Sequence, residues 1–391
     1  MGIHTIVISG QLVIALAVPP LPSPEMAAQS AEKKTSKPDP PKPKRPKKRK
    51  QPSSGQIAEE FIISTLEKGI EGLRREFNRN PRIYDTAKCT VSCRNPTLNR
   101  YKDIGCHDHN RVHVVGANPD EYIHANYVGI EKNPKCFICT QGPMEATCAD
   151  FWMMVIQQKA WSILMLGEFE EQNRPRCAKY YPDKLGQQLT FQTRDRGPIV
   201  VTNSGEEEDM GGRRSTDEMV LFIRPGHAAQ VHIRHMTVRG LDSEYEVTHY
   251  HVAARFRWVN WPDRGAPPPN QDPFNLLYDM CCGSDSSPIV LHCSAGVGRA
   301  GALVLMRAVL EKELRQCRAG LVQTPHQYYY VHAALLKFLS DTICKRDRMI
   351  KLRPKAMPFW ADYKKEIDKV NDANNKSTMS YLPSLEKEKQ I

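Results

Sequence analysis

The segment from Pro288 to Leu303 (PIVLHCSAGVGRAGAL) limits the possible fold more than any other part of the chain. It opens with a short apolar run, Ile289–Leu291, which predicts a buried strand. A turn of small residues and glycines follows, and a helix is expected after it. A strand that enters such a turn at a helix N-terminus directs successive backbone N–H groups at one point. The segment therefore predicts a strand–turn–helix unit that binds a phosphate-like dianion.

Two side chains give this loop a chemistry beyond anion binding. Cys293 lies at the mouth of the loop, in a positive potential that favours the thiolate, which is the nucleophilic form. Arg299 follows six residues later and can fold back to bind two phosphoryl oxygens at once. A buried structural cysteine would require neither this arginine nor the glycines. We therefore interpret Cys293 as a nucleophile and Arg299 as the clamp on its substrate.

By composition, the chain of 391 residues divides into three parts. Residues 1–54 are an N-terminal extension, basic and Pro-rich, with too few large apolar residues after Met26 to offset the entropy of ordering, so we expect disorder there. Residues 55–350 open with an amphipathic helix and then mix strand-like and helical runs. This mixture favours a single α/β domain with a central mixed sheet. Residues 351–391 are charged and largely polar, and we expect a C-terminal tail with room for a short helix.

The formal net charge of +11 is concentrated in the run Lys33–Lys50. Because the rest of the chain is nearly balanced, this charge is weak support for a nucleic-acid-binding fold. The run is either a functional segment, namely a nuclear localisation signal or a patch for an anionic surface, or a solvated tail, and these alternatives remain open. The apolar stretch Thr5–Val18 has no preceding Lys or Arg and is shorter than a membrane span, so we expect neither a signal peptide nor an anchor. Whether the protein starts at Met1 or at Met26 also remains open.

The loop from His292 to Arg299 (HCSAGVGR) resembles the signature of the classical, phosphotyrosine-specific protein tyrosine phosphatases. The resemblance covers roughly residues 55–345 and points to a non-receptor-like single catalytic domain. It implies a highly twisted mixed β-sheet flanked by helices, and hydrolysis of phosphotyrosine in proteins through a phospho-cysteine intermediate. The implied phosphate-binding residues of the loop are Ser294, Ala295, Gly296, Val297 and Gly298, with His292 in support.

Further motifs occur in the order that this family has them. Trp261–Gly265 (WPDRG) resembles the mobile acid loop, which implies Asp263 as general acid and later as general base, with Trp261 in support. Gln323 and Gln327 resemble the glutamine loop; Gln323 would position the attacking water and Gln327 would assist. This stretch could also cap a helix, and both readings can hold together.

The recognition of the substrate is implied by Asn99–Asp103 (NRYKD), which resembles the phosphotyrosine-recognition loop. Tyr101 would stack on the substrate ring and set a pocket depth that phosphoserine cannot span. Asp103 would accept backbone N–H bonds from the substrate peptide. A dual-specificity phosphatase, the related enzymatic alternative, should lack this loop.

Three supporting segments also match. In Glu171–Pro182, Glu171 corresponds to the glutamate that pairs with the signature arginine, and Arg176 replaces a usual lysine. Asp120–Tyr127 and Thr140–Pro143 resemble core segments; within the first, His124 stands where asparagine is usual, and we expect no catalytic consequence. Two arginines on family positions are expected to be structural: Arg315 and Arg318.

Cysteine spacing gives no independent function. The twelve cysteines are irregularly spaced, as is typical of reduced thiols in a cytosolic or nuclear compartment. Cys136 and Cys139 form a Cys-x-x-Cys pair without the second pair that a zinc site needs. Five further residues could in principle bind zinc, but the sequence around them matches the recognition loop: Cys89, Cys93, Cys106, His107 and His109. We expect neither a metal nor another cofactor.

Ala300 is the departure from the family pattern that matters, because Ser or Thr usually follows the signature arginine. The lost hydroxyl would donate to the cysteine sulfur, and a hydrogen bond to a charged group contributes about 1.5–3 kcal/mol. We expect a slower enzyme, with an inactive phosphotyrosine-binding pseudophosphatase as the alternative. The expected partners are phosphotyrosine-containing proteins; we expect no need for nucleic acid in catalysis and no association with a membrane. The expected location is the cytoplasm, with entry to the nucleus possible through Lys33–Lys50.

Overall fold

The computed structural model describes residues 3–8, 11–16, 54–79, 85–130, 133–209, 231–252, 261, 265–266, 287–308, 316–342 and 346–379. Three features predicted from the sequence lie outside these ranges: the basic run Lys33–Lys50, the candidate acid Asp263, and Arg315. None of the helices in the described ranges has an apolar stretch long enough to cross a membrane.

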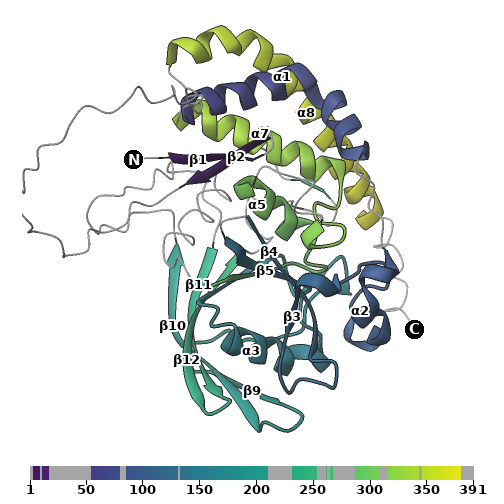
Figure 1. Ribbon diagram of the computed structural model, residues 1–391, viewed down its shortest axis with the longest axis vertical. Helices are drawn as coiled ribbons and strands as arrows, with labels where there is room; N and C mark the ends of the chain where they lie inside the picture. The colour runs from purple at the N-terminus through teal and green to yellow at the C-terminus, as the bar shows by residue number, and fades with distance from the viewer. Residues whose placement is uncertain are drawn as a thin grey trace, which may run out of the picture.

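A mixed sheet of nine strands forms the centre of the molecule, in the order β3-β4-β5-β13-β6-β12-β11-β10-β9 (Figure 1). Its strands are β3 (Arg111–His113), β4 (Tyr122–Ile130), β5 (Asn133–Thr140), β6 (Ser162–Leu166), β9 (Gln188–Gln192), β10 (Pro198–Asp209), β11 (Val231–Gly240), β12 (Ser243–Val252) and β13 (Ile289–His292). The mixed sheet flanked by helices confirms the fold class expected from the sequence.

The strand that precedes Cys293 lies in the middle of this sheet. β13 pairs in parallel with β5 on one side and with β6 on the other, and all four of its residues are buried. Ile289 and Leu291 point into one apolar core and Val290 into the other. An uninterrupted apolar run is therefore what a central parallel strand requires, because both of its faces are covered.

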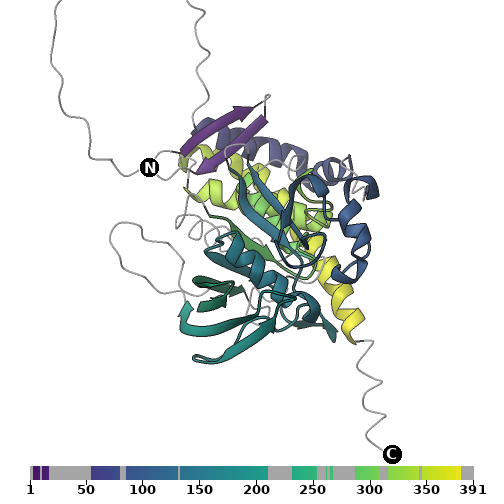
Figure 2. The same ribbon diagram turned by 60° about the horizontal axis from the view of Figure 1, so that its bottom comes forward.

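Helices cover both faces of the sheet (Figures 1 and 2). One face carries α3 (Cys148–Gln157), whose buried residues join the core that contains Val290. The other carries α1 (Ser54–Arg79), α5 (Arg299–Ala308), α7 (Pro325–Thr342) and α8 (Arg346–Met379). The short elements are α2 (Thr90–Arg94), the 3-10 turns η1 (Thr86–Lys88), η2 (Pro96–Leu98), η3 (Asp108–Asn110) and η4 (Glu145–Thr147), and the hairpin β7 (Glu170–Glu171) and β8 (Arg174–Pro175).

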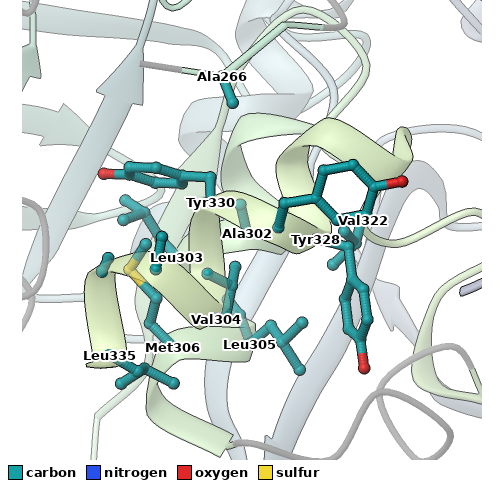
Figure 3. Close-up of a cluster of buried hydrophobic side chains, with 14 of the residues drawn as sticks. Ala266, Ala302, Leu303, Val304, Leu305, Met306, Val322, Tyr328, Tyr330 and Leu335 are labelled. Atoms are coloured by element: carbon teal, nitrogen blue, oxygen red, sulfur yellow. The ribbon is translucent and has the colours of Figure 1, made fainter. Parts of the chain in front are cut away.

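Packing between α5 and α7 supports the loop that carries Cys293. Figure 3 shows Tyr330 and Leu335 of α7 around Leu303 and Met306 of α5. All four side chains are at most 3% exposed. Because α5 begins at Arg299, this apolar contact fixes the helix from which the loop is suspended.

The C-terminal region differs from the expected charged tail. Helix α8 buries Phe359, Tyr363 and Ile367 in the same core as α5 and α7. Arg74 of α1 also donates to Glu366 at 2.6 Å. The three buried residues recur every four positions, so they form a narrow apolar stripe on one side of the helix. The average polarity of residues 351–391, from which a charged tail with room for a short helix was expected, gives no sign of this stripe.

The N-terminal extension also contains structure that was not expected. β1 (Ile3–Ile8) and β2 (Gln11–Leu16) pair antiparallel as a hairpin, with Ile8 opposite Gln11. β1 is rich in β-branched residues, β2 is apolar after Gln11, and the Ser9–Gly10 dipeptide between them is a turn signal. The disorder expected for residues 1–54 rests on composition and stays a prediction.

Candidate active site

The sheet topology brings three loops to one edge. β5, β13 and β6 are parallel neighbours, so their carboxyl ends meet on the same side. Gln141–Pro143 follows β5, Gly167–Glu171 follows β6, and the loop Cys293–Gly298, called the nucleophile loop below, follows β13. Binding sites in open α/β sheets form at the carboxyl ends of parallel strands. The arrangement brings Glu171 and Arg299, which are 128 positions apart in the sequence, into one site.

Cys293 is 7% exposed at the start of the nucleophile loop. The backbone N–H of Gly296 donates to its sulfur at 3.2 Å. Gly296 has a φ of 69°, and a Cβ there would lie 2.0 Å from the carbonyl oxygen of Thr140. Only glycine can make this turn, and the turn aims an amide at the sulfur.

Arg299, the first residue of α5, is held by a carboxylate. Its two terminal nitrogens donate to the two oxygens of Glu171 at 2.6 and 2.5 Å, and Nη1 also donates to the Leu166 carbonyl at 3.1 Å. Burial raises the pKa of the Glu171 carboxyl, but the hydrogen bonds and charge of Arg299 outweigh it and leave this pKa below its ordinary value. The bidentate pair fixes the plane of the guanidinium. The pair implied by the resemblance is therefore present.

Tyr101 lies beside the nucleophile loop. Its hydroxyl is 2.7 Å from Ser294 Oγ and accepts a hydrogen bond from Arg176 Nη1 at 3.0 Å. The neighbouring Arg100 donates to the carbonyls of Gly142 and Pro143. These bonds hold Asn99–Asp103 against the site, and Asp103 is exposed to solvent, where a peptide could reach it.

The glutamine segment caps a helix and also touches the nucleophile loop. Gln327 Oε1 accepts from the backbone N–H groups of Gln323 and Thr324, at 2.8 and 3.2 Å, at the N-terminus of α7. A Cβ added at Gly298 would lie 2.9 Å from Gln327 Nε2 and 3.1 Å from Gln323 Oε1. Both amides therefore lie against the loop, so the cap is observed and the position of the amides is compatible with the expected catalytic role.

His292 is fully buried below the site. Its Nε2 is 2.7 Å from the hydroxyl of Tyr180, which also lies 2.6 Å from Nε2 of His249. Burial lowers the pKa of His292 to about 3, so the ring is neutral. It anchors the end of β13 rather than contributing a charge.

Arg318 is the residue whose importance the sequence understated. It is fully buried, and its guanidinium donates to the carbonyls of Gly296 and Ala295 at 2.9 and 3.1 Å. It donates in addition to Asn126 Oδ1 at 2.9 Å. A buried arginine must be paired, and its partners here are the nucleophile loop itself. The available sequence signal was weak: one charge before the uncharged run Ala319–Pro325.

The remaining candidates are placed only in part. Trp261 is 8% exposed and its ring lies 5.1 Å from that of Tyr330, while Asp263 lies outside the described residues. Ala300 is fully buried in the core at the start of α5. In the described ranges, no group of three or more His, Cys, Asp or Glu side chains is arranged to hold a metal ion.

Comparison with known proteins agrees with this geometry. A model of the protein-tyrosine phosphatase family matches residues 95–337. Tyrosine-protein phosphatase non-receptor type 9 of Rattus norvegicus is 32% identical over 315 residues, which cover 71% of this chain and 48% of the relative. Tyrosine-protein phosphatase 69D of Drosophila melanogaster is 33% identical over 288 residues, 68% of this chain and 18% of the relative.

A third relative, tyrosine-protein phosphatase non-receptor type 2 of Mus musculus, is 29% identical over 290 residues, 70% of this chain and 63% of the relative. The chain thus spans less than two thirds of the length of each of these relatives. The family match nevertheless covers more than half of this chain and includes all three loops of the site. The chain belongs to the protein-tyrosine phosphatase family.

Proposed function

We propose that this protein hydrolyses phosphotyrosine in proteins through a phospho-cysteine intermediate. The observation that carries the proposal is the nucleophile loop, with Cys293 at one end and Arg299, oriented by Glu171, at the other. A tetrahedral dianion placed between them would meet loop N–H groups, the N-terminus of α5 and a guanidinium. Family membership supports the same activity.

In the first step, Cys293 Sγ attacks phosphorus and the bond from phosphorus to the tyrosine oxygen breaks. The loop N–H groups and Arg299 stabilise the charge on the three non-bridging oxygens. The leaving oxygen takes a proton, and we assign its donor as Asp263. The products are tyrosine and a phosphate ester of Cys293.

In the second step, water attacks the phospho-cysteine. We assign Gln323 to the orientation of this water, since an amide can do so without taking its proton. Asp263, now ionised, accepts the proton. The phosphorus–sulfur bond breaks, inorganic phosphate forms, and the thiolate of Cys293 is restored.

We assign the selectivity for phosphotyrosine to the side chain of Tyr101, which lies beside the nucleophile loop. Its hydroxyl is tied to Ser294 and Arg176, so the ring has a fixed position beside the loop. A substrate must reach past this ring to Cys293, which phosphoserine is too short to do. Tyr101→Ala should reduce the preference for phosphotyrosine over phosphoserine on matched peptides. Unchanged selectivity would contradict this role.

The inactive alternative is a phosphotyrosine-binding pseudophosphatase. Its support is Ala300, which is buried beside the signature arginine and carries no hydroxyl. Because Cys293, Arg299 and Asp263 are all present in the chain, we favour the enzyme. We assign it to the cytoplasm, with entry to the nucleus if Lys33–Lys50 is recognised as a basic signal, and we assign no role to nucleic acid in catalysis.

The deciding experiment compares the protein with its Cys293→Ser variant on a phosphotyrosine peptide. An alcohol cannot replace the thiolate near neutral pH, so we expect loss of phosphate release. The variant should stay folded by circular dichroism. Equal rates in the two proteins would refute the mechanism, and peptide binding without phosphate release by the unmodified protein would favour the pseudophosphatase.

A further inference from the structure

His124 on β4 is buried and has a hydrogen-bond partner at each ring nitrogen. Its Nδ1 lies 3.1 Å from Nη2 of Arg318, and its Nε2 lies 3.0 Å from the carbonyl oxygen of Ile104. A guanidinium can only donate, and a carbonyl can only accept. Both contacts therefore require the same tautomer, with Nδ1 bare and the proton on Nε2.

The charge state of the ring is fixed by the same surroundings. Burial, and then the charge of Arg318, lower the pKa of His124 to about 3. A second proton would have to sit on Nδ1 and point at a cation. The ring of Tyr122 lies edge-on to the ring of His124, with centroids 6.5 Å apart. The ring is thus a neutral acceptor on one side and a donor on the other.

Arg318 connects this ring to the nucleophile loop. It holds the carbonyls of Ala295 and Gly296, and in a planar trans peptide the N–H points opposite to the carbonyl. Holding the Ala295 carbonyl therefore turns the Gly296 N–H the other way, toward Cys293 Sγ at 3.2 Å. The orientation of Arg318 decides where the loop amides point.

Two residues on one face of β4 set that orientation. Asn126 accepts from Nη1 of Arg318, and His124 accepts from Nη2. Residues two apart on a strand share a face, so a single strand grips both arms of the guanidinium. We propose that His124, in its Nε2–H tautomer, is a positioning residue that aligns the phosphate-binding amides of the nucleophile loop through Arg318. From the sequence alone, no catalytic consequence was expected at this position.

Amide substitutions separate the two bonds of the ring. The side-chain oxygen of asparagine can occupy the place of Nδ1, whereas the longer glutamine places its amide near Nε2. His124→Asn therefore keeps the acceptor for Arg318 and loses the donor to Ile104, and His124→Gln does the reverse. His124→Leu removes both and controls for packing.

We expect His124→Asn to keep kcat/KM on a phosphotyrosine peptide within about threefold. His124→Gln and His124→Leu should lose about tenfold or more, because a lost bond to a charged group is the larger loss. Binding of tungstate, a tetrahedral dianion, should weaken in parallel in a calorimetric titration. An equal loss in the Asn and Gln variants, or a better Gln variant, would show that the ring merely anchors Ile104 and would overturn the proposal.

The tautomer is tested without any activity. In protein with ¹⁵N-labelled histidine, two-bond ¹H–¹⁵N correlations at pH 7 should show a bare Nδ1 and a protonated Nε2 for His124. The signal is identified by its loss in His124→Asn. An Nδ1–H tautomer or an imidazolium would overturn the proposal. The kinetic arm rests on the proposed phosphatase function; a protein without turnover would refute that function, while tungstate binding and the tautomer would still decide on His124.

Discussion

The edge of the sheet that carries Cys293 and the layer formed by α1, α7 and α8 are both buried, but they are held by different forces. At the edge, charged and polar groups meet in a fixed geometry: Arg299 with Glu171, and Arg318 with His124 and the loop carbonyls. In the layer, Phe359, Tyr363 and Ile367 are buried in an apolar core. Hydrogen bonds give direction with modest net stability, whereas apolar burial gives stability without direction. The two regions should therefore fail differently when mutated.

The largest expected effect is on activity at the edge. Arg299→Lys keeps the charge but loses the bidentate fork, so kcat/KM for a phosphotyrosine peptide should fall by about a thousandfold, or about 4 kcal/mol. The midpoint of thermal unfolding should change little. A matched control is Arg239→Lys, since Arg239 donates to Glu244 in an exposed pair. Activity of Arg299→Lys within tenfold of the unmodified protein would mean that geometry matters less at this edge than we argue.

Low pH should reduce the stability of both regions, because each contains a buried neutral histidine. Burial lowers the pKa of His124 and His292, at the edge, and of His332, in the layer, to about 3. Between about pH 6.5 and pH 3 the unfolded chain binds these protons and the folded protein does not, so stability falls as the pH falls. Asp150 has the opposite effect, because burial raises its pKa to about 7. In most of this pH range the folded protein holds a proton on Asp150 that the unfolded chain does not, and this cancels the contribution of one histidine. Together these four groups contribute two net protons, or roughly 3 kcal/mol per pH unit, and His249, whose pKa burial lowers well below its ordinary value, makes the slope steeper.

This slope can be measured by urea unfolding between pH 6.5 and pH 4.5. His332 lies on α7 against Phe61 and Thr65 of α1. His332→Phe should reduce the slope by about 1.4 kcal/mol per pH unit, the contribution of one proton. An unchanged slope would show that this ring already takes up its proton in the folded protein.

In the helical layer we expect loss of stability with little loss of activity. Tyr363 is 1% exposed, and replacing a large buried aromatic residue by alanine costs about 3–5 kcal/mol. Tyr363→Ala should lower the free energy of unfolding by about 3 kcal/mol and leave kcat within a few-fold at 20 °C. A loss of kcat without loss of stability would show that α8 acts on the site directly, and the contrast between the regions would be wrong.

The same contrast explains what could be predicted from the sequence. The nucleophile loop was readable because its chemistry needs particular residues at a fixed spacing, from Cys293 to Arg299. α8 was missed because three apolar residues in a polar segment signal a helix only once a partner surface is known. The role of His124 was missed because it depends on Arg318, 194 positions away, through a contact that only the fold creates.

The smallest expected effect concerns Ala300, where the two kinds of region meet: the residue is buried in the apolar core but lies beside the nucleophile loop. A hydroxyl here would stabilise the leaving thiolate and so favour the second step. Without it, phospho-enzyme should accumulate, giving a burst of tyrosine release before a slow steady state. Ala300→Ser should raise steady-state turnover by about tenfold, which corresponds to about 1.4 kcal/mol, and leave the burst rate nearly unchanged in stopped-flow measurements. Ala302→Ser, equally buried on α5, is the matched control and should give no gain. No burst in the unmodified protein, together with no gain in Ala300→Ser, would show that breakdown of the phospho-enzyme does not depend on this position.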